Sequence, residues 1–170
     1  MFVAAAVGIL AAAAVPQLTA TIERTRTASA ARYLAGRLAF ARTLAVARAA
    51  NVALMLTPDG DSSTLAIYVD GNGNGVRTRE AGGVDRLLAG PLRFATMFPH
   101  VTVSPNDPVD SSSTWTTTLM SFTPLGTASS GTLYLRGRDG SQYAVRVLGA
   151  TGRTRVLRYE PVTRTWVEVS

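Results

Sequence analysis

An uninterrupted apolar stretch opens the chain, and a proline closes it. Residues 1–15 carry no charge and no hydrogen-bonding side chain, and Pro16 follows them directly. As a helix this stretch would rise about 22 Å, at about 1.5 Å per residue, whereas the hydrocarbon core of a bilayer is about 30 Å thick. A secretory signal carries a basic segment before its apolar run, and only Met1 precedes Phe2 here. The stretch is therefore too short to span a membrane, and it lacks the basic segment of a secretory signal.

Apolar residues then recur at helical spacing from Thr19 to Ala50, a stretch without proline. The apolar positions are Leu34, Leu38, Ala41 and Ala45, with Tyr33, Phe40 and Leu44 beside them. Glu23 is the only acid, and the basic residues are Arg24, Arg26, Arg32, Arg37, Arg42 and Arg48. We predict one basic amphipathic helix to about Ala50. It should bend at Pro16, because proline removes a backbone hydrogen bond and its ring clashes with the preceding turn.

After Asn51 the pattern changes to short runs of β-branched and aromatic residues between polar turn clusters. We predict strands at residues 52–57, 64–69, 101–103, 115–122, 132–137, 143–149, 155–160 and 165–169. Short polar breaks at 58–63 and 137–140 are typical of hairpins, which predicts an antiparallel sheet. Residues 104–114, rich in Ser, Pro and Asp, are expected to form a mobile, exposed loop.

These patterns predict an α+β fold in two parts. Residues 1–50 form the helix, with 1–16 as its membrane or filament-core part and 17–50 as its amphipathic part. Residues 51–170 form a β-rich domain on which the amphipathic part packs. Lipid would hold one end of the chain, and the sheet would stand in water.

Composition narrows the chemistry. The 170 residues include no Cys and a single histidine, His100, which excludes disulfides, thiolate nucleophiles and Cys-based zinc sites. All 17 basic residues are Arg, so lysine-dependent catalysis is excluded as well. No nucleophile or acid pair is distinguished by its position, and we expect neither enzymatic activity nor a cofactor. The net charge of +6 is compatible with nucleic acid or anionic lipid as a partner, and equally with a general preference for arginine codons.

Several motifs carry a family resemblance. Residues 7–16 (VGILAAAAVP) resemble the N-terminal segment of type IV pilins and type II secretion pseudopilins, where a glycine and a proline recur at the separation of Gly8 and Pro16. Four further motifs make the chain similar to the GspH/FimT subgroup. They are LAFAR at 38–42, YVDGNGNG at 68–75, FTPLG at 122–126 and GRTR at 152–155.

The resemblance implies a pilin-like fold and a structural role as a minor pseudopilin of a type II secretion pseudopilus or a type IV pilus. It implies a single pass through the bacterial inner membrane, with the β-rich domain in the periplasm. Prepilin peptidase would cleave the precursor and methylate the new N-terminus, and the other partners would be pilins or pseudopilins of the same fibre. The residues expected in the assembly helix are Phe2, Val3, Val7, Gly8, Ile9, Leu10, Val15 and Pro16. Small residues there let helix backbones approach closely.

The chain departs from the family at its start. Members begin with a basic leader that ends in Gly and continue with a sequence of the Phe-Thr-Leu-Ile-Glu type, which alignment on Gly8 and Pro16 puts before Met1. We therefore expect Met1 to be an internal methionine. Restoring about six residues would lengthen the apolar helix to about 32 Å, enough to span a bilayer.

Two clusters are candidates for binding. Asp70, Asn72, Asn74 and Gly75 match the first half of an EF-hand calcium loop, but Ala81 stands at the twelfth position, where a bidentate acid is needed. The alternative is a structural turn, because Gly and Asn tolerate positive φ.

The second cluster is basic. If Arg153 and Arg155 begin a strand, alternation puts both on one face, and Arg146 and Arg158 would add charge nearby. The pattern resembles the Gly-Arg-x-Arg motif of FimT-type minor pilins that bind DNA through backbone phosphates during uptake. The alternatives are a solvated basic hairpin and, for the whole chain, a soluble β-domain that carries a signal.

Overall fold

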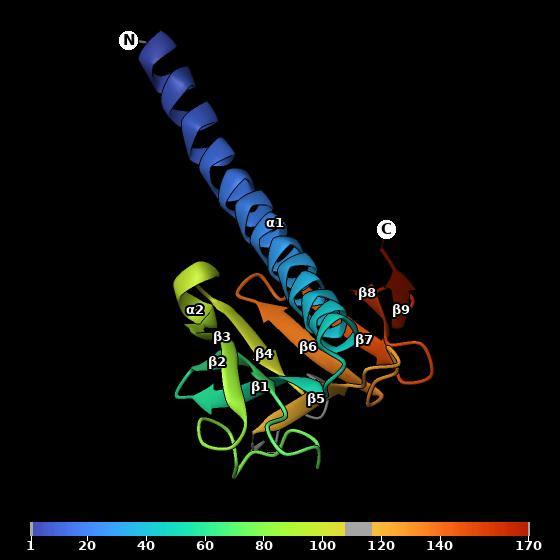
Figure 1. Ribbon diagram of the computed structural model, residues 1–170. Helices are drawn as coiled ribbons and strands as arrows, with labels where there is room; N and C mark the ends of the chain where they lie inside the picture. The colour runs from blue at the N-terminus through green and yellow to red at the C-terminus, as the bar shows by residue number, and fades with distance from the viewer. Residues whose placement is uncertain (1, 108–116, 170) are drawn as a thin grey trace.

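The computed structural model describes the backbone of residues 2–107 and 117–169, and the side chains of residues 21–107 and 117–169 (Figure 1). One long helix, α1 (Phe2–Arg48), rests with its C-terminal half on the β-strands, and its N-terminal half projects beyond them. The helix ends at Arg48, two residues before the predicted limit, and Ala49, which follows it, has a φ of +48°. The prediction of a single helix is confirmed. The bend at Pro16 stays a prediction, because that side chain lies outside the described residues.

The strands form two antiparallel sheets. The four-stranded sheet has the order β3-β2-β1-β5, and the five-stranded sheet has the order β4-β6-β7-β8-β9. The strands are β1 (Val52–Asp59), β2 (Ser62–Val69), β3 (Arg86–Arg93), β4 (Val101–Ser104), β5 (Thr118–Phe122), β6 (Gly131–Gly137), β7 (Gln142–Leu148), β8 (Arg153–Glu160) and β9 (Thr165–Glu168). A short helix, α2 (Phe94–Met97), lies between β3 and β4. The predicted α+β, pilin-like fold is confirmed, and each predicted strand has a counterpart.

One core joins α1 to the inner faces of both sheets. On the four-stranded sheet, alternate residues of β1 and β2 face one another across the ladder, as in the Leu54–Ile67 and Leu56–Leu65 pairs, and all four are buried. Leu34 and Leu38 of α1 are also fully buried among these side chains. Each such leucine contributes about 1.5–3 kcal/mol through burial. The amphipathic half of α1 is therefore an integral part of the folded domain.

The sequence prediction missed β3. This strand contains Gly90 and Pro91, which break the β pattern and remove a backbone donor. The interruption is tolerated because β3 lies at the edge of its sheet, with register shifts against β2. Gly90 has φ +97°, and a Cβ there would lie 2.6 Å from the Leu65 carbonyl oxygen, so only glycine fits.

Two expectations fall wholly or partly outside the described residues. The side chains of residues 1–16, including the expected assembly residues, are among those not described. Of the expected mobile loop at 104–114, residues 108–114 are not described either. Within the part of the chain that is described, no helix is both long enough and apolar enough to cross a membrane.

Candidate functional site

Three of the family-like motifs meet at the C-terminal half of α1. Arg42, the last residue of the 38–42 motif, donates from Nε to the carbonyl oxygen of Gly126 in the turn after β5 (3.0 Å). The hairpin between β7 and β8 lies against the same spot, because a Cβ on Gly152 would overlap the Gly126 carbonyl and come within 2.9 Å of the Arg42 side chain. We call Arg42, Gly126 and Gly152 the glycine–arginine junction. It ties the helix to one turn from each sheet.

The fourth motif builds a loop around the carboxylate of Asp70. Oδ1 accepts hydrogen bonds from the backbone N–H groups of Asn72 (3.1 Å) and Gly73 (2.8 Å). Oδ2 accepts from the Gly75 N–H (2.7 Å) and from Nδ2 of Asn51 (3.0 Å), the residue immediately before β1. Burial acts to raise the pKa of Asp70, but the hydrogen bonds from these four residues outweigh it and hold the pKa below its ordinary value of 3.8.

Two further acids close the loop from its far end. Asp85 is fully buried and accepts from the N–H groups of Gly71 (3.2 Å) and Arg77 (2.8 Å). Glu80 accepts from Nδ2 of Asn72 (3.1 Å) and Nδ2 of Asn74 (3.2 Å). Desolvation acts to raise the pKa of Glu80, yet these amide donors and then the neighbouring arginines lower it. Sequence reasoning missed Asp85, which has no local signature and lies 15 positions after Asp70.

The geometry of this loop is that of a structural turn. Both oxygens of Asp70 are occupied by hydrogen bonds, and the side-chain amides of both asparagines donate to Glu80. Among the residues that the structure describes, no group of three or more His, Cys, Asp or Glu side chains is placed to hold a metal ion. The calcium assignment therefore gains no support.

We expect the Asp70→Asn substitution to lower the free energy of unfolding at neutral pH by about 1–3 kcal/mol, because an amide replaces an acceptor of four hydrogen bonds. Since the folded state lowers the pKa, the contribution is fully present above the ordinary pKa and lost as the pH falls through the folded value. The difference between wild type and variant should shrink below about pH 4. Urea denaturation across pH measures it.

The control for Asp70 is Asp61→Asn, the same change in charge in the exposed turn between β1 and β2. We expect this variant to stay within about 0.5 kcal/mol of wild type at every pH. A pH-independent loss at Asp70, or an equal loss at Asp61, would contradict the role of the carboxylate.

The predicted basic cluster divides between two faces of the five-stranded sheet. Arg146 of β7 lies directly opposite Arg155 of β8, and Arg153 is two positions from Arg155, so these three share the face turned away from α1. Arg158 lies opposite Tyr143, which puts it on the other face. Arg155 also forms an ion pair with Glu168 of β9 (3.2 Å). The structure therefore brings together Arg146, Arg153 and Arg155 but not Arg158.

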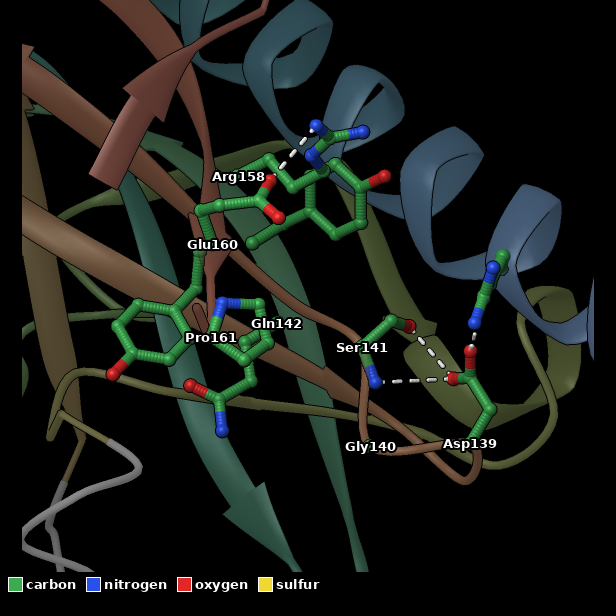
Figure 2. Close-up of a pocket in the computed structure, with 10 residues that line it drawn as sticks. Asp139, Gly140, Ser141, Gln142, Arg158, Glu160 and Pro161 are labelled. Atoms are coloured by element: carbon green, nitrogen blue, oxygen red, sulfur yellow. Dashed lines mark hydrogen bonds and ion pairs between the residues drawn. The ribbon is translucent and has the colours of Figure 1, made fainter. Parts of the chain in front are cut away.

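Arg158 lines a polar cleft of about 400 Å³ between α1 and the ends of β7 and β8 (Figure 2). Its charged side chains pair with one another, Arg158 with Glu160 (3.1 Å) and Arg24 of α1 with Asp139 (3.7 Å). The four charges cancel. Nothing in this charge balance favours an anionic ligand such as a phosphate in the cleft.

Comparison with known proteins decides the family. The family model of the type II transport protein GspH matches residues 30–152, more than half of the chain. The chain belongs to the GspH family. Among solved structures, the minor pseudopilin EpsH from the type 2 secretion system of Vibrio cholerae matches with 12% identity and a TM-score of 0.47, over 78% of this chain and 97% of that chain. No curated protein matches.

The GspH match divides the candidate residues. It covers the glycine–arginine junction and the loop around Asp70, and it ends at Gly152. Arg153, Arg155 and Arg158 lie beyond it. The hydrogen bonds of the junction and of the Asp70 loop fix α1 and the turns inside the matched region, and the match does not extend to the arginines of β8.

Proposed function

We propose that this GspH-family chain is a minor pseudopilin of a type II secretion system, a structural subunit that assembles through the N-terminal half of α1. The observation that carries the proposal is the arrangement of α1 in a GspH-family chain. Its C-terminal half is locked into the domain core, and its N-terminal half projects free of the sheets (Figure 1). A rigid domain on a projecting helix can join a helical bundle without unfolding.

The proposal includes the membrane steps that the family resemblance implies. The apolar residues before Pro16 anchor the subunit in the inner membrane, and the β-rich domain stands in the periplasm. Prepilin peptidase processes and methylates the precursor, and the assembled partners are other pseudopilins of the fibre. Ala and Gly dominate residues 4–14, which supports close packing of neighbouring helices. The proposed two-part organisation follows from these roles: residues 1–50 form the helix that anchors and assembles the subunit, and residues 51–170 form the β-rich domain in the periplasm.

A type IV pilus subunit that binds DNA through the basic face is the weaker alternative. The arginines of its motif lie beyond the end of the GspH match, Arg158 faces the other side of the sheet, and Arg155 pairs with Glu168. We therefore place the protein with secretion rather than with DNA uptake. Its role is structural, not catalytic.

The test is a single arginine in the apolar segment. In a strain whose own copy is deleted, we expect the full-length precursor to restore secretion of a type II substrate and the Leu10→Arg precursor to fail. A charged residue at the centre of a membrane helix costs about 2.5–3.5 kcal/mol of insertion. The variant should also shift out of the membrane fraction. Both quantities are measured by immunoblot of fractionated cells and medium.

The matched control is Leu125→Arg, because Leu125 is 89% exposed at the tip of the turn after β5. This variant should remain in the membrane fraction and restore secretion. The proposal is overturned if deletion leaves secretion intact, or if the Leu10→Arg protein is secretion-competent. Loss of pilus-dependent motility with normal secretion would instead assign the protein to a type IV pilus.

A further inference from the structure

The face of the five-stranded sheet turned away from α1 carries an unusual combination of side chains. Strand alternation and register put arginines from β6, β7 and β8 on it, together with aromatic residues from β6, β8 and β9. We define the outer sheet face by Arg136, Arg146, Arg153, Arg155, Tyr134, Tyr159 and Trp166. The opposite face carries the core residues Leu133, Leu135, Val145 and Val147.

The outer sheet face carries more arginine side chains than acidic side chains that pair with them. Arg146 and Arg155 lie directly opposite each other on adjacent strands, an arrangement that is destabilising for like charges. Glu168 pairs with Arg155, but Arg136, Arg146 and Arg153 have no ion-pair partner within the described residues. By contrast, six other arginines of the described residues pair with acids, for example Arg93 with Asp59 at 3.0 Å. Among the described residues, this face therefore carries more arginines than acids paired with them.

A second observation concerns Arg155. Its Nε is buried and has no hydrogen-bond partner in the part of the chain that the structure describes. A buried donor without an acceptor costs about 1–3 kcal/mol. A carboxylate bound to the outer sheet face could accept from the neighbouring guanidinium groups. Within the described residues, Glu168 pairs with Arg155, and Asp107 lies beside Tyr134.

The aromatic residues indicate what kind of molecule carries the acids. Trp166 packs between Tyr134 and Tyr159, with ring centroids 5.6 Å and 5.2 Å apart and tilted planes. The rings thus pack on each other rather than standing apart as platforms for stacked bases. Exposed Leu148 lies directly opposite Arg153. Tyr, Trp and Arg are the residues that are enriched at the energetic centres of protein interfaces.

We propose that the outer sheet face docks an acidic polypeptide surface, whose carboxylates pair with Arg136, Arg146 and Arg153 and whose apolar side chains contact Trp166 and Leu148. The contact is separate from fibre assembly, because it uses the β-domain and not the projecting half of α1. The partner is recognised by charge complementarity, with the aromatic cluster as the apolar anchor.

The experiment uses the full-length chain in neutral detergent and a fluorescent acidic peptide of repeated Glu-Glu-Leu units, followed by anisotropy. We expect salt-sensitive binding that is weakened about tenfold in the Arg146→Ala/Arg153→Ala double variant. The matched control is Arg32→Ala/Arg86→Ala, which removes equal charge from α1 and β3 and should keep full affinity. Circular dichroism melting of all variants checks that each is folded.

Three outcomes overturn the proposal. The first is no binding of the peptide by the wild type. The second is an equal loss of affinity in the control double variant, which would show that net charge alone attracts the peptide. The third is tighter binding of an oligothymidylate of equal charge at the same ionic strength, lost in the Arg146→Ala/Arg153→Ala variant, which would make the face a nucleic-acid site.

Discussion

The Gly152→Ala substitution is expected to lower the free energy of unfolding by about 2–5 kcal/mol, because two costs coincide at this position. Gly152 has φ +61°, a left-handed conformation that a side chain disfavours by about 1–2 kcal/mol. The added Cβ would also overlap the Gly126 carbonyl oxygen, which already accepts from Arg42. Moving either group loosens the contact between α1 and both turns.

The control separates the two costs. Gly140, in the turn between β6 and β7, has φ +81°, and a Cβ there would meet nothing within 4 Å. Gly140→Ala should therefore lower the free energy of unfolding by only about 1–2 kcal/mol, the cost of placing a side chain at positive φ. Urea denaturation followed by Trp fluorescence measures both variants. Equal losses at the two positions would show that the glycine–arginine junction is not tightly packed.

The sequence predicts the elements of this fold better than their meeting points. The helix could be identified because apolar residues recur at helical spacing over a long stretch without proline, and most strands because β-branched residues run between turn signals. β3 could not be identified, because a glycine followed by a proline is typical of a turn. Gly90 and Pro91 are tolerated in this strand only because it lies at the edge of its sheet. The pattern of a single segment does not reveal such tertiary context.

The candidate site shows the same limit. The motifs around Arg42, Gly126 and Gly152 are visible in the sequence, but their contact joins residues 84 positions apart in the case of Arg42 and Gly126. Asp85 could not be singled out, because its role depends on the fold of the whole loop. The sequence does allow one to predict that Arg158 and Arg155 lie on opposite faces of the sheet, because residues three positions apart in a strand point to opposite sides.

The Leu38→Ala substitution is expected to cost about 2–5 kcal/mol, because it leaves a cavity at the centre of the contact between α1 and the sheets. Leu38 is fully buried in the core cluster that joins the helix to both sheets. For a chain of this size the melting temperature falls by about 2–4 °C per kcal/mol. The melting temperature should therefore fall by roughly 4–20 °C, as measured by circular dichroism during thermal unfolding.

Phe40, two residues further along the same helix, supplies the control. Phe40 is 45% exposed, and the Cζ atom of Arg37 lies 5.7 Å from the centre of its ring. We expect Phe40→Ala to lower stability by less than about 1 kcal/mol, although it removes a larger side chain. If Phe40→Ala were the more destabilising change, the exposed side of α1 would carry the stability of the domain, and the helix would not be held chiefly by its buried stripe. If Leu38→Ala is the more destabilising of the two variants, the buried side of α1 holds the helix to the β-domain. Fibre assembly then depends on this packing, because a domain weakly attached to α1 cannot follow the position of that helix in a fibre.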